Sequence, residues 1–390
     1  MNKEALATNT TLPLLPPGNL PRVDHDTTVP FTLHPTNGDL IEQLTVITKM
    51  VHVPIWEELR YTLLRTIDSG GQADVWQAVD LSTGRFCAIK KLKPELQTNS
   101  AYTGHFYQEA LGLRYRHKKA VPVTDFFILN DNFYLVMPYI EYPRVDDLID
   151  SNNLKLTDIK EIIVGATEVL DYTSGFGLIN RDPKPSNMFY DPDTKQFLMI
   201  DFGLTRVKNL PAVEPDGTFS GTVSYATKED IEGDPVERES RTICRLGTIL
   251  FELLTGETMY ARSTMAKTFD TIVNPTKTHL RIKALQSALT GRFHVSYPEI
   301  PEQKIQSTYN KTILTDFHKF HPLVRVILKA TFLSHDVRYQ TLKAFQEATI
   351  EAMQKAETDW VPEDISFPGL RREKNSTVIF RPATFSGASD

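Results

Sequence analysis

Two short segments combine the residue types that a phosphoryl-transfer reaction needs. The first is Asn-Arg-Asp-Pro-Lys-Pro-Ser-Asn at 180–187, and the second, Asp-Phe-Gly, begins at Asp201. Asp182 can accept a proton from a hydroxyl group, and Lys184 can neutralise a phosphoryl group in transit. Asn187 and the aspartate of the second segment can hold a divalent metal ion from two sides of a hairpin. The spacing therefore predicts metal-assisted phosphoryl transfer.

A glycine pair and a lysine upstream have the order of a nucleotide-binding site. Gly70 and Gly71 lie in a predicted hairpin, where the missing Cβ lets backbone N–H groups approach anionic phosphate oxygens. Lys90 follows at the end of a predicted strand, 20 residues after Gly70, and Glu109 lies 19 residues farther on. Taken alone, the glycine pair could be an ordinary turn and the lysine a solvated charge. Their common register favours a phosphate anchor at Lys90.

The order of these segments resembles that of the protein kinases over about residues 60–345. Farther along, Gly-Thr-Val-Ser-Tyr at 221–225 and Glu229 are similar to the end of an activation segment in that family. Arg338 is similar to the buried arginine that pairs with this glutamate. The lysine two positions after the catalytic-loop aspartate, together with Thr222, is typical of serine/threonine kinases rather than tyrosine kinases. The chain thus resembles the eukaryotic-like serine/threonine protein kinases, in a divergent form of bacterial, phage or viral type.

The resemblance implies a site for ATP and Mg²⁺, with Mn²⁺ as an alternative metal. In the family's pattern Asp182 and Lys184 are the catalytic residues. Asn187 and Asp201 are the metal ligands. The residues implied to bind the nucleotide are Ile67, Gly70, Gly71, Val75, Ala88, Lys90, Glu109, Met137, Pro138, Tyr139, Ile140 and Phe189.

Several of these residues have distinct expected roles along the nucleotide. Lys90 would contact the α- and β-phosphates and pair with Glu109 in the active state. Met137 would limit the depth of the ATP pocket. The adenine edge would bond the backbone at 138–140, where Pro138 offers only its carbonyl because proline has no N–H group.

An α+β fold with two lobes is predicted. The resemblance implies a small lobe of antiparallel strands and one helix at 60–137, a hinge at 138–141 and a large, mainly α-helical lobe at 142–345, which together make a bilobal protein kinase-like fold. Runs of strand-forming residues predict strands over Tyr61–Ile67, Asp74–Val79, Phe86–Leu92, Phe126–Leu129 and Phe133–Met137.

Apolar spacing of the helical kind predicts the main helices. One helix of the small lobe carries Glu109. A second contains apolar residues from 159 to 170 behind Thr157, the expected N-cap. A third, from Thr242 to Leu254, is apolar on nearly every side and ends at Gly256, as a helix buried in the centre of a lobe would.

The segments outside this core have their own compositions. Residues 1–36 contain six prolines, which disfavours a ladder of backbone hydrogen bonds and predicts a flexible arm. A short helix is predicted over 40–53, within an N-terminal extension at 37–59. An insertion is expected around 258–320. The C-terminal extension is 346–390, and within it the tail from Trp360 to Asp390 has Ser-Thr-Val-Ile-Phe as its one apolar cluster.

Charge and composition narrow the class of protein. A net charge of −6 over 390 residues gives no basic excess for a polyanion, so nucleic acid is not an expected partner. Cys87 and Cys244 are the only cysteines, which argues against disulfides and a zinc site. No apolar run has the length of a signal peptide or a membrane span. We expect a cytoplasmic protein that acts on protein substrates, with delivery into a host cell left open and the oligomeric state not indicated.

The chain departs from the family's pattern at several positions. Asp68 stands where the first loop glycine is usual and Ala73 where the third is. An added carboxylate near phosphates should weaken ATP binding. Asn180 replaces the usual histidine, Thr227 begins the segment that replaces Ala-Pro-Glu, and Thr242 replaces an aspartate that braces the catalytic loop. None of these changes removes a group that touches ATP, metal or acceptor, so an active enzyme is favoured.

Two other functions remain open. The departures are compatible with a nucleotide-binding scaffold that transfers little or no phosphate, a pseudokinase. A kinase of small molecules could share the same lobes, but such enzymes generally lack the segment 221–229 and its Arg338 partner. That segment favours a protein substrate.

The segment between the two motifs suggests a switch. Arg181 beside Asp182 resembles an arginine that an activation-loop phosphate balances in such kinases. Thr218 and Ser220 lie in the stretch 215–220, which we expect to be exposed and mobile. Autophosphorylation at one of them is therefore expected to raise activity. The alternative is that Asp216 or Glu214 already balances Arg181, which would make the enzyme constitutively active.

Overall fold

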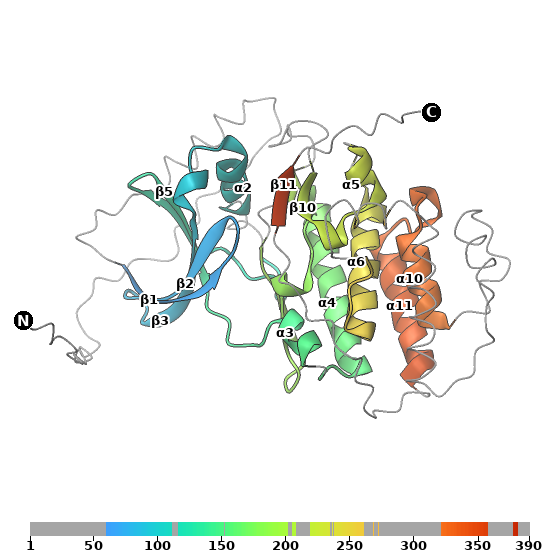
Figure 1. The fold of residues 1–390 in the computed structure, drawn as a ribbon. Helices are drawn as coiled ribbons and strands as arrows, with labels where there is room; N and C mark the ends of the chain where they lie inside the picture. The colour runs from blue at the N-terminus through green and yellow to red at the C-terminus, as the bar shows by residue number, and fades with distance from the viewer. Residues whose placement is uncertain are drawn as a thin grey trace, which may run out of the picture.

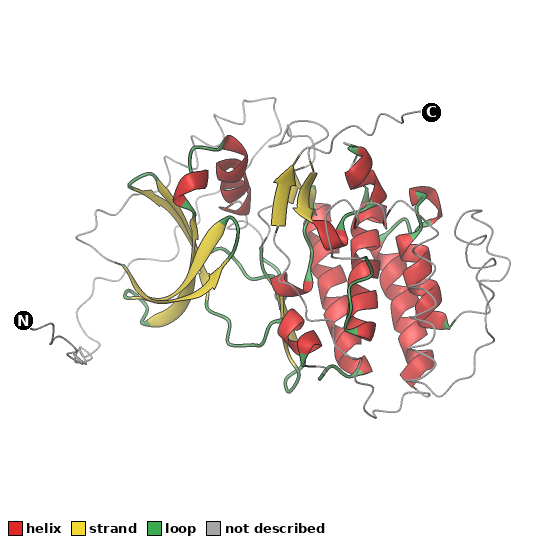
Figure 2. Cartoon of the chain, in the orientation of Figure 1, coloured by secondary structure: helices red, strands yellow, loops and turns green. Residues whose placement is uncertain are grey.

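In the computed structural model of this chain, the described residues are 60–110, 116–151, 153–201, 205–207, 219–234, 236, 238–260, 268, 272, 321–357 and 377–380. The predicted arm at 1–36, the helix at 40–53 and nearly all of the insertion around 258–320 lie outside them. The described chain forms a sheet-rich lobe and a helical lobe that lie side by side (Figure 1). Figure 2 separates them by colour, with yellow strands in one lobe and mostly red helices in the other.

A five-stranded antiparallel sheet forms the small lobe, with strand order β1-β2-β3-β5-β4. The strands are β1 (Tyr61–Ser69), β2 (Ala73–Asp80), β3 (Arg85–Leu92), β4 (Asp125–Leu129) and β5 (Asn132–Pro138). Asn130 and Asp131 form the two-residue loop between β4 and β5, with φ of 48° and 60°. Left-handed loop residues suit the twist of a tight hairpin, and Asn and Asp tolerate them. The predicted strands are confirmed, each lengthened by one or two residues.

Helix α2 (Ser100–Ala110) packs against this sheet and carries Glu109. Phe106 and Ala110 of the helix share one buried cluster with Leu135 of β5. Burial of these apolar side chains stabilises the contact between helix and sheet. It also fixes the position of Glu109, whose side chain is buried.

The large lobe is built around one buried helix. Its helices are α3 (Val145–Asp150), α4 (Leu156–Gly175), α5 (Lys228–Glu232), α6 (Glu239–Thr255), α10 (Pro322–Thr331) and α11 (Leu342–Glu357). Helix α6 contacts α4, α10 and α11, and all its residues from Ser240 to Thr255 are buried. Gly256 ends it with φ of 76°, a left-handed conformation that glycine adopts without steric cost. The predicted central helix is confirmed.

The start of α4 differs from the prediction. Thr157 is not the N-cap, because it lies inside the first turn. The cap is Lys155, whose backbone N–H donates to Oδ2 of Asp158 at 2.9 Å. The hydroxyl of Tyr190 donates to the other carboxylate oxygen, also at 2.9 Å. A carboxylate in the first turn satisfies an unpaired N–H group and suits the positive end of the helix dipole.

Three buried ion pairs fasten α5 to the rest of the large lobe. Asp230 lies 2.5 Å from Nη2 of Arg241 and 2.9 Å from Nη2 of Arg245, both on α6. Burial alone would raise the pKa of Asp230, but the two guanidinium groups lower it well below its ordinary value. Glu229 pairs with Arg338 at 2.8 Å, as the family resemblance implies. These charges hold the chain just beyond residue 222 in a fixed position.

Six short strands pair two by two in the large lobe. They are β6 (Leu178–Asn180) with β9 (Thr205–Val207), β7 (Met188–Asp191) with β8 (Gln196–Met199), and β10 (Phe219–Thr222) with β11 (Thr377–Phe380). In Figure 1, β11 (red) comes from the C-terminal tail and lies beside β10. Phe219 and Ser220 of the stretch 215–220 lie in β10, and the rest of it lies outside the described residues, so its expected exposure and mobility stay predictions.

The C-terminal helix crosses a predicted boundary. Helix α11 runs through residue 345, where the kinase-like region was expected to end, and it packs on α4, α6 and α10. Phe345 and Met353 belong to the main buried cluster, so the helix is part of the core. Within the described ranges, no helix has both the length and the apolar content needed to cross a membrane.

We predict that Gly165→Ala destabilises the fold, whereas Gly175→Ala in the same helix does not. A Cβ at Gly165 would lie 2.5 Å from Cδ1 of the buried Phe197, while a Cβ at Gly175 meets nothing within 4 Å. In urea unfolding, the first variant should lose about 1–3 kcal/mol. The second should change by at most about 1 kcal/mol, toward greater stability, because alanine is the better helix former. Equal stability of the two variants would show that α4 and β8 can move apart without cost.

Candidate active site

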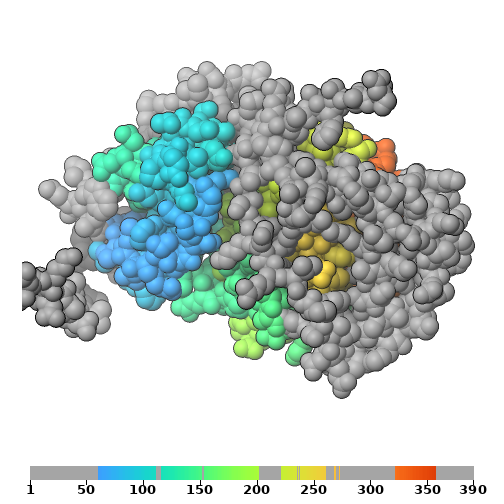
Figure 3. All heavy atoms as spheres, viewed as in Figure 1, coloured from blue at the N-terminus to red at the C-terminus, as the bar shows by residue number. Residues whose placement is uncertain are grey.

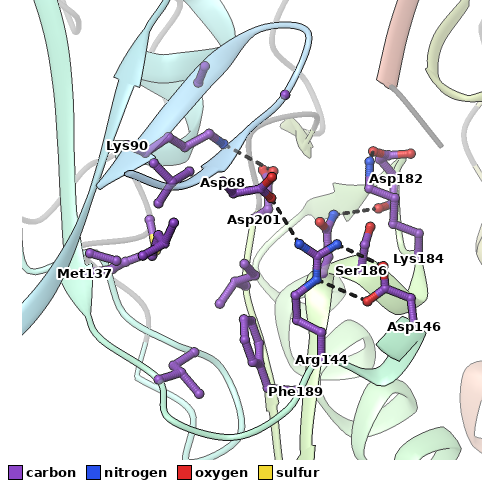
Figure 4. Close-up of a pocket in the computed structure, with 18 of the residues that line it drawn as sticks. Asp68, Lys90, Met137, Arg144, Asp146, Asp182, Lys184, Ser186, Phe189 and Asp201 are labelled. Carbon is purple, nitrogen blue, oxygen red and sulfur yellow. Dashed lines mark hydrogen bonds and ion pairs between the residues drawn. The ribbon is translucent and has the colours of Figure 1, made fainter. Parts of the chain in front are cut away.

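A cavity of about 560 Å³ lies between the sheet and the helical lobe. Figure 3 shows atoms of the first strands, in blue, meeting green atoms of the large lobe, and Figure 4 opens the cavity to view. Its lining contains all sixteen predicted site residues: Ile67, Gly70, Gly71, Val75, Ala88, Lys90, Glu109, Met137, Pro138, Tyr139, Ile140, Asp182, Lys184, Asn187, Phe189 and Asp201. The size suits a small-molecule ligand. The fold thus brings these residues to one place, and their individual roles stay predictions.

Lys90 joins the two lobes at the inner end of the cavity. Its Nζ lies 2.8 Å from Oε2 of Glu109 and 3.1 Å from Oδ2 of Asp201. Strand β3 supplies the lysine, α2 supplies the glutamate, and the aspartate follows β8. Figure 4 draws the contact between Lys90 and Asp201 across the space between the lobes. The expected pairing of Lys90 with Glu109 is present in this geometry.

Burial and charge act in opposite senses on this group of side chains. Burial lowers the pKa of Lys90, but the carboxylates of Asp201 and Glu109 raise it more, so the net change is upward. Burial raises the pKa of Glu109 above its ordinary value, and the lysine opposes that rise. Lys90 therefore stays charged at neutral pH and provides a fixed cation for an anionic ligand.

Two asparagines hold the loop that carries Asp182, between β6 and β7. Oδ1 of Asn180 accepts the backbone N–H of Asp182 at 2.9 Å, and Nδ2 of Asn180 donates to the carbonyl of Asp201 at 3.3 Å. Nδ2 of Asn187 donates to the carbonyl of Asp182 at 3.2 Å. Asn180, which stands where the family has a histidine, thus links the two segments that carry the predicted chemistry.

The carboxylate of Asp182 has two fixed partners. Its Oδ2 lies 2.8 Å from Nζ of Lys184, and its Oδ1 accepts the backbone N–H of Thr222 at 2.8 Å. Lys184 also donates to Oγ1 of Thr222 at 3.1 Å. All three residues are buried. A buried carboxylate fixed in this way is oriented to accept a proton from a group that enters the cavity.

The predicted metal ligands offer oxygen atoms of the appropriate kind. Asn187 and Asp201 both line the cavity, and Mg²⁺ prefers carboxylate and amide oxygens. Asp201 has φ of 63°, a strained conformation that persists where the surroundings fix it. In the part of the chain that the structure describes, no cluster of three or more His, Cys, Asp and Glu could hold a metal. Mg²⁺ at a phosphate site needs only one or two protein ligands beside phosphate and water, so the residues fit.

The residues expected to contact adenine lie together along the cavity. Ala88 and Met137 are neighbours across β3 and β5, and both are buried. Phe189, from β7, lines the cavity on the side of the large lobe (Figure 4). Pro138 is the last residue of β5, opposite Cys87, so this strand extends one residue into the predicted hinge.

A charged cluster at the cavity was missed by the sequence reasoning. Nη1 of Arg144 lies 3.0 Å from Oδ2 of Asp68, and Nη2 lies 2.9 Å from Oδ2 of Asp146. Figure 4 shows Arg144 between the two carboxylates. Arg144 supplies a counter-charge to Asp68, which opposes the expected weakening of ATP binding, and that expectation stays a prediction. No motif pointed to Arg144, since its partner in β1 is 76 residues away in sequence.

Two further departures from the family's pattern lie in the large lobe, and one of them, Thr227, has a clear structural role. The Oγ1 of Thr227 accepts the backbone N–H of Asp230 at 3.3 Å, and the Thr227 N–H donates to the Asp230 carboxylate at 2.7 Å. This reciprocal bonding caps α5. Thr242 is buried in α6 and cannot supply the negative charge of the usual aspartate.

Comparison with known proteins agrees with this geometry. A family model described as protein kinase domain matches residues 61–331. The chain is 29% identical over 201 residues to the probable serine/threonine-protein kinase PknB of Lactococcus lactis, a match covering 51% of this chain and 32% of that protein. It is 29% identical over 203 residues to the serine/threonine-protein kinase PknD of Mycobacterium tuberculosis (51% of this chain, 30% of the relative). It is 30% identical over 202 residues to the serine/threonine-protein kinase PrkC of Bacillus subtilis (50% and 30%). The matches therefore span about a third of each relative.

We predict that Arg144 supports ATP binding through Asp68. Arg144→Ala should weaken binding of a non-hydrolysable ATP analogue about fivefold, close to 1 kcal/mol, because it leaves carboxylates without a counter-charge near the phosphates. In an Asp68→Ala background the same change should cost clearly less. Calorimetric titration of the four proteins measures this coupling. An equal loss in both backgrounds would show that Arg144 acts on the nucleotide without Asp68.

Proposed function

The chain belongs to the eukaryotic-like serine/threonine protein kinase family, and from this premise we propose that it transfers the γ-phosphoryl group of ATP to serine or threonine hydroxyls of protein substrates. One observation carries the proposal: the buried Asp182 carboxylate is held at 2.8 Å by both Lys184 and the Thr222 N–H. The same cavity contains the Lys90 ammonium. A fixed proton acceptor beside fixed cations is what phosphoryl transfer requires.

The proposed reaction uses these groups in one step. The acceptor oxygen bonds to the γ-phosphorus as the bond to the β,γ-bridging oxygen breaks and ADP leaves. Asp182 takes the hydroxyl proton, and Lys184 offsets the charge that develops beside it. Lys90 holds the α- and β-phosphates. Asn187 and Asp201 would hold Mg²⁺, which when bound neutralises charge on the phosphate oxygens.

Two observations support this proposal over its alternatives. Two of the departures that suggested a silent nucleotide-binding scaffold have partners here: Asp68 is paired with Arg144, and Asn180 bonds both predicted catalytic segments. The buried pair of Glu229 and Arg338 fixes the segment that follows β10, which favours a protein over a small-molecule substrate. A cytoplasmic location and the lack of a nucleic-acid partner are also proposed, on the net charge and the apolar pattern of the sequence.

Control by autophosphorylation remains part of the proposal. Thr218 lies outside the described residues, and Ser220 lies in β10. A phosphate on either residue would bring negative charge to the segment that leads to Thr222, and Arg181 is the expected partner. Peptide mass spectrometry of the active protein would find this phosphate between residues 205 and 224.

Asp182→Asn is predicted to remove proton acceptance while ATP still binds. The phosphorylation rate of a generic basic protein should fall about 100-fold or more, close to 2.7 kcal/mol in the barrier. Transfer from labelled ATP measures the rate, and titration with a non-hydrolysable analogue measures binding. Asp193→Asn, at an exposed position, is the matched control and should be as active as the wild type. A rate above about a tenth of the wild-type value would exclude Asp182 as the base.

Lys90→Met and Asp201→Asn are each predicted to abolish transfer, because they remove the phosphate anchor and a metal ligand. The matched control is Lys91→Met, whose ammonium lies on the neighbouring residue of β3, 5.7 Å from the ring of Tyr134. It should keep most of the activity in the same assay. Strong activity in Lys90→Met together with loss in Lys91→Met would mean that the register of the phosphate anchor is shifted by one residue.

A further inference from the structure

The C-terminal tail contributes a strand, β11, to the large lobe. This strand lies beside β10, which ends at Thr222. β11 pairs antiparallel with β10 over four residues, with Thr377 opposite Thr222, Val378 opposite Gly221 and Ile379 opposite Ser220. The edge of β10 that faces β11, called its outer edge below, therefore accepts an extended chain through backbone hydrogen bonds. Such strand addition is a common way to bind peptides, and it needs no particular side chain on the added strand.

One end of this pairing is next to the proposed chemistry. Thr222 donates its N–H to the Asp182 carboxylate, and its hydroxyl accepts a hydrogen bond from Lys184. Paired residues in antiparallel strands have Cα atoms about 4.5–5.5 Å apart. Thr377 thus occupies the register position nearest to a residue that bonds directly to the proposed base.

The tail sequence is suited to this position. Thr-Val-Ile-Phe at 377–380 consists of β-branched and aromatic residues, which favour strands. Pro382 follows two residues later, and proline cannot continue a ladder because it has no N–H group. Residues 371–375, before the strand, are polar and charged. The strand-forming part of the tail is therefore confined to the length that β10 can pair.

We propose that the outer edge of β10 is a docking site for extended peptides, that residues 377–380 of the same chain fill it, and that Thr377 is a phosphorylation site. This inference rests on the proposed function. In the step, the Thr377 hydroxyl oxygen bonds to the γ-phosphorus of ATP, the bond to the bridging oxygen breaks, ADP leaves with the electron pair, and Asp182 takes the proton. While docked, the tail competes with other peptide substrates.

Docking can be tested without catalysis, on the full-length chain. Neighbouring residues of a strand direct their N–H groups to opposite sides, so one of the two N–H groups of Val378 and Ile379 faces β10. Changing both residues to proline removes that N–H group. Hydrogen exchange of a peptide covering 219–222 should become about tenfold faster in this variant. The matched control, Ser386→Pro with Gly387→Pro, changes the same tail beyond the described strand and should leave exchange as it is.

The acceptor can be tested by mapping phosphate after incubation with Mg²⁺ and ATP. We expect phosphate on Thr377 at a rate that does not depend on protein concentration, because donor and acceptor belong to one chain. Thr377→Val keeps a β-branched residue, and it should lose this phosphate while a generic basic protein is still phosphorylated. Thr384→Val, in the same tail, should keep the phosphate. The double-proline variant should phosphorylate an added peptide about twofold or more faster, because the competing strand is absent.

Each part of the inference has a result that would overturn it. Unchanged exchange at 219–222 in the double-proline variant would exclude docking. Phosphorylation of the generic protein without phosphate on Thr377, or with a rate that rises with protein concentration, would exclude Thr377 as an acceptor within its own chain. If exchange responds but neither the tail nor the generic protein is phosphorylated, the proposed function fails and the role of Thr377 fails with it, while the docking edge stands.

Discussion

The contact between one ammonium group and two carboxylates decides whether this site exists. Lys90 comes from the sheet, Glu109 from α2 and Asp201 from the segment after β8, and they meet within 2.8 and 3.1 Å. Each partner depends on a different part of the packing: the strand ladder, the apolar contact of α2 with the sheet, and the β7–β8 hairpin in the large lobe. The charges alone could not assemble them, because desolvation of buried ions is costly. Apolar burial brings the three groups together, and their mutual attraction then fixes the distances.

Much of this fold could be predicted from sequence because local signals agree with the final packing. The strands follow runs of strand-forming residues, Asn130 and Asp131 between two of them form a tight loop, and Gly256 ends the central helix. The cap of α4 could not be predicted at Thr157, since the group that caps it is a carboxylate, Asp158, bonded to the backbone of the residue before the helix. The capping preference of threonine is weaker than that of a carboxylate which Tyr190 and Lys195 also hold.

Some of the site residues could likewise be predicted from the sequence, and others could not. Residues carried by motifs of fixed spacing, such as Asp182 and Lys90, could be identified from the chain alone, and all of the predicted set line one cavity. The pair of Asp68 and Arg144 and the pairing of β10 with β11 could not. Each joins segments far apart in sequence without any periodic pattern, so only the folded arrangement reveals the contact. A substitution that looks unfavourable in a motif can thus be compensated by a residue that no motif contains.

The pair of Arg144 and Asp68 has a consequence for the timing of the reaction cycle. This pair links β1 to the residue before α3 at the cavity. The side chain of Arg144 is 25% exposed and that of Asp68 is 45% exposed, so dissolved ions can screen the pair. A contact of this kind contributes about 0.2–1 kcal/mol and breaks often. Nucleotide exchange should therefore quicken with ionic strength, while the buried Lys90 contacts keep their strength. If release of ADP limits the proposed phosphoryl transfer, moderate salt would speed that reaction rather than slow it.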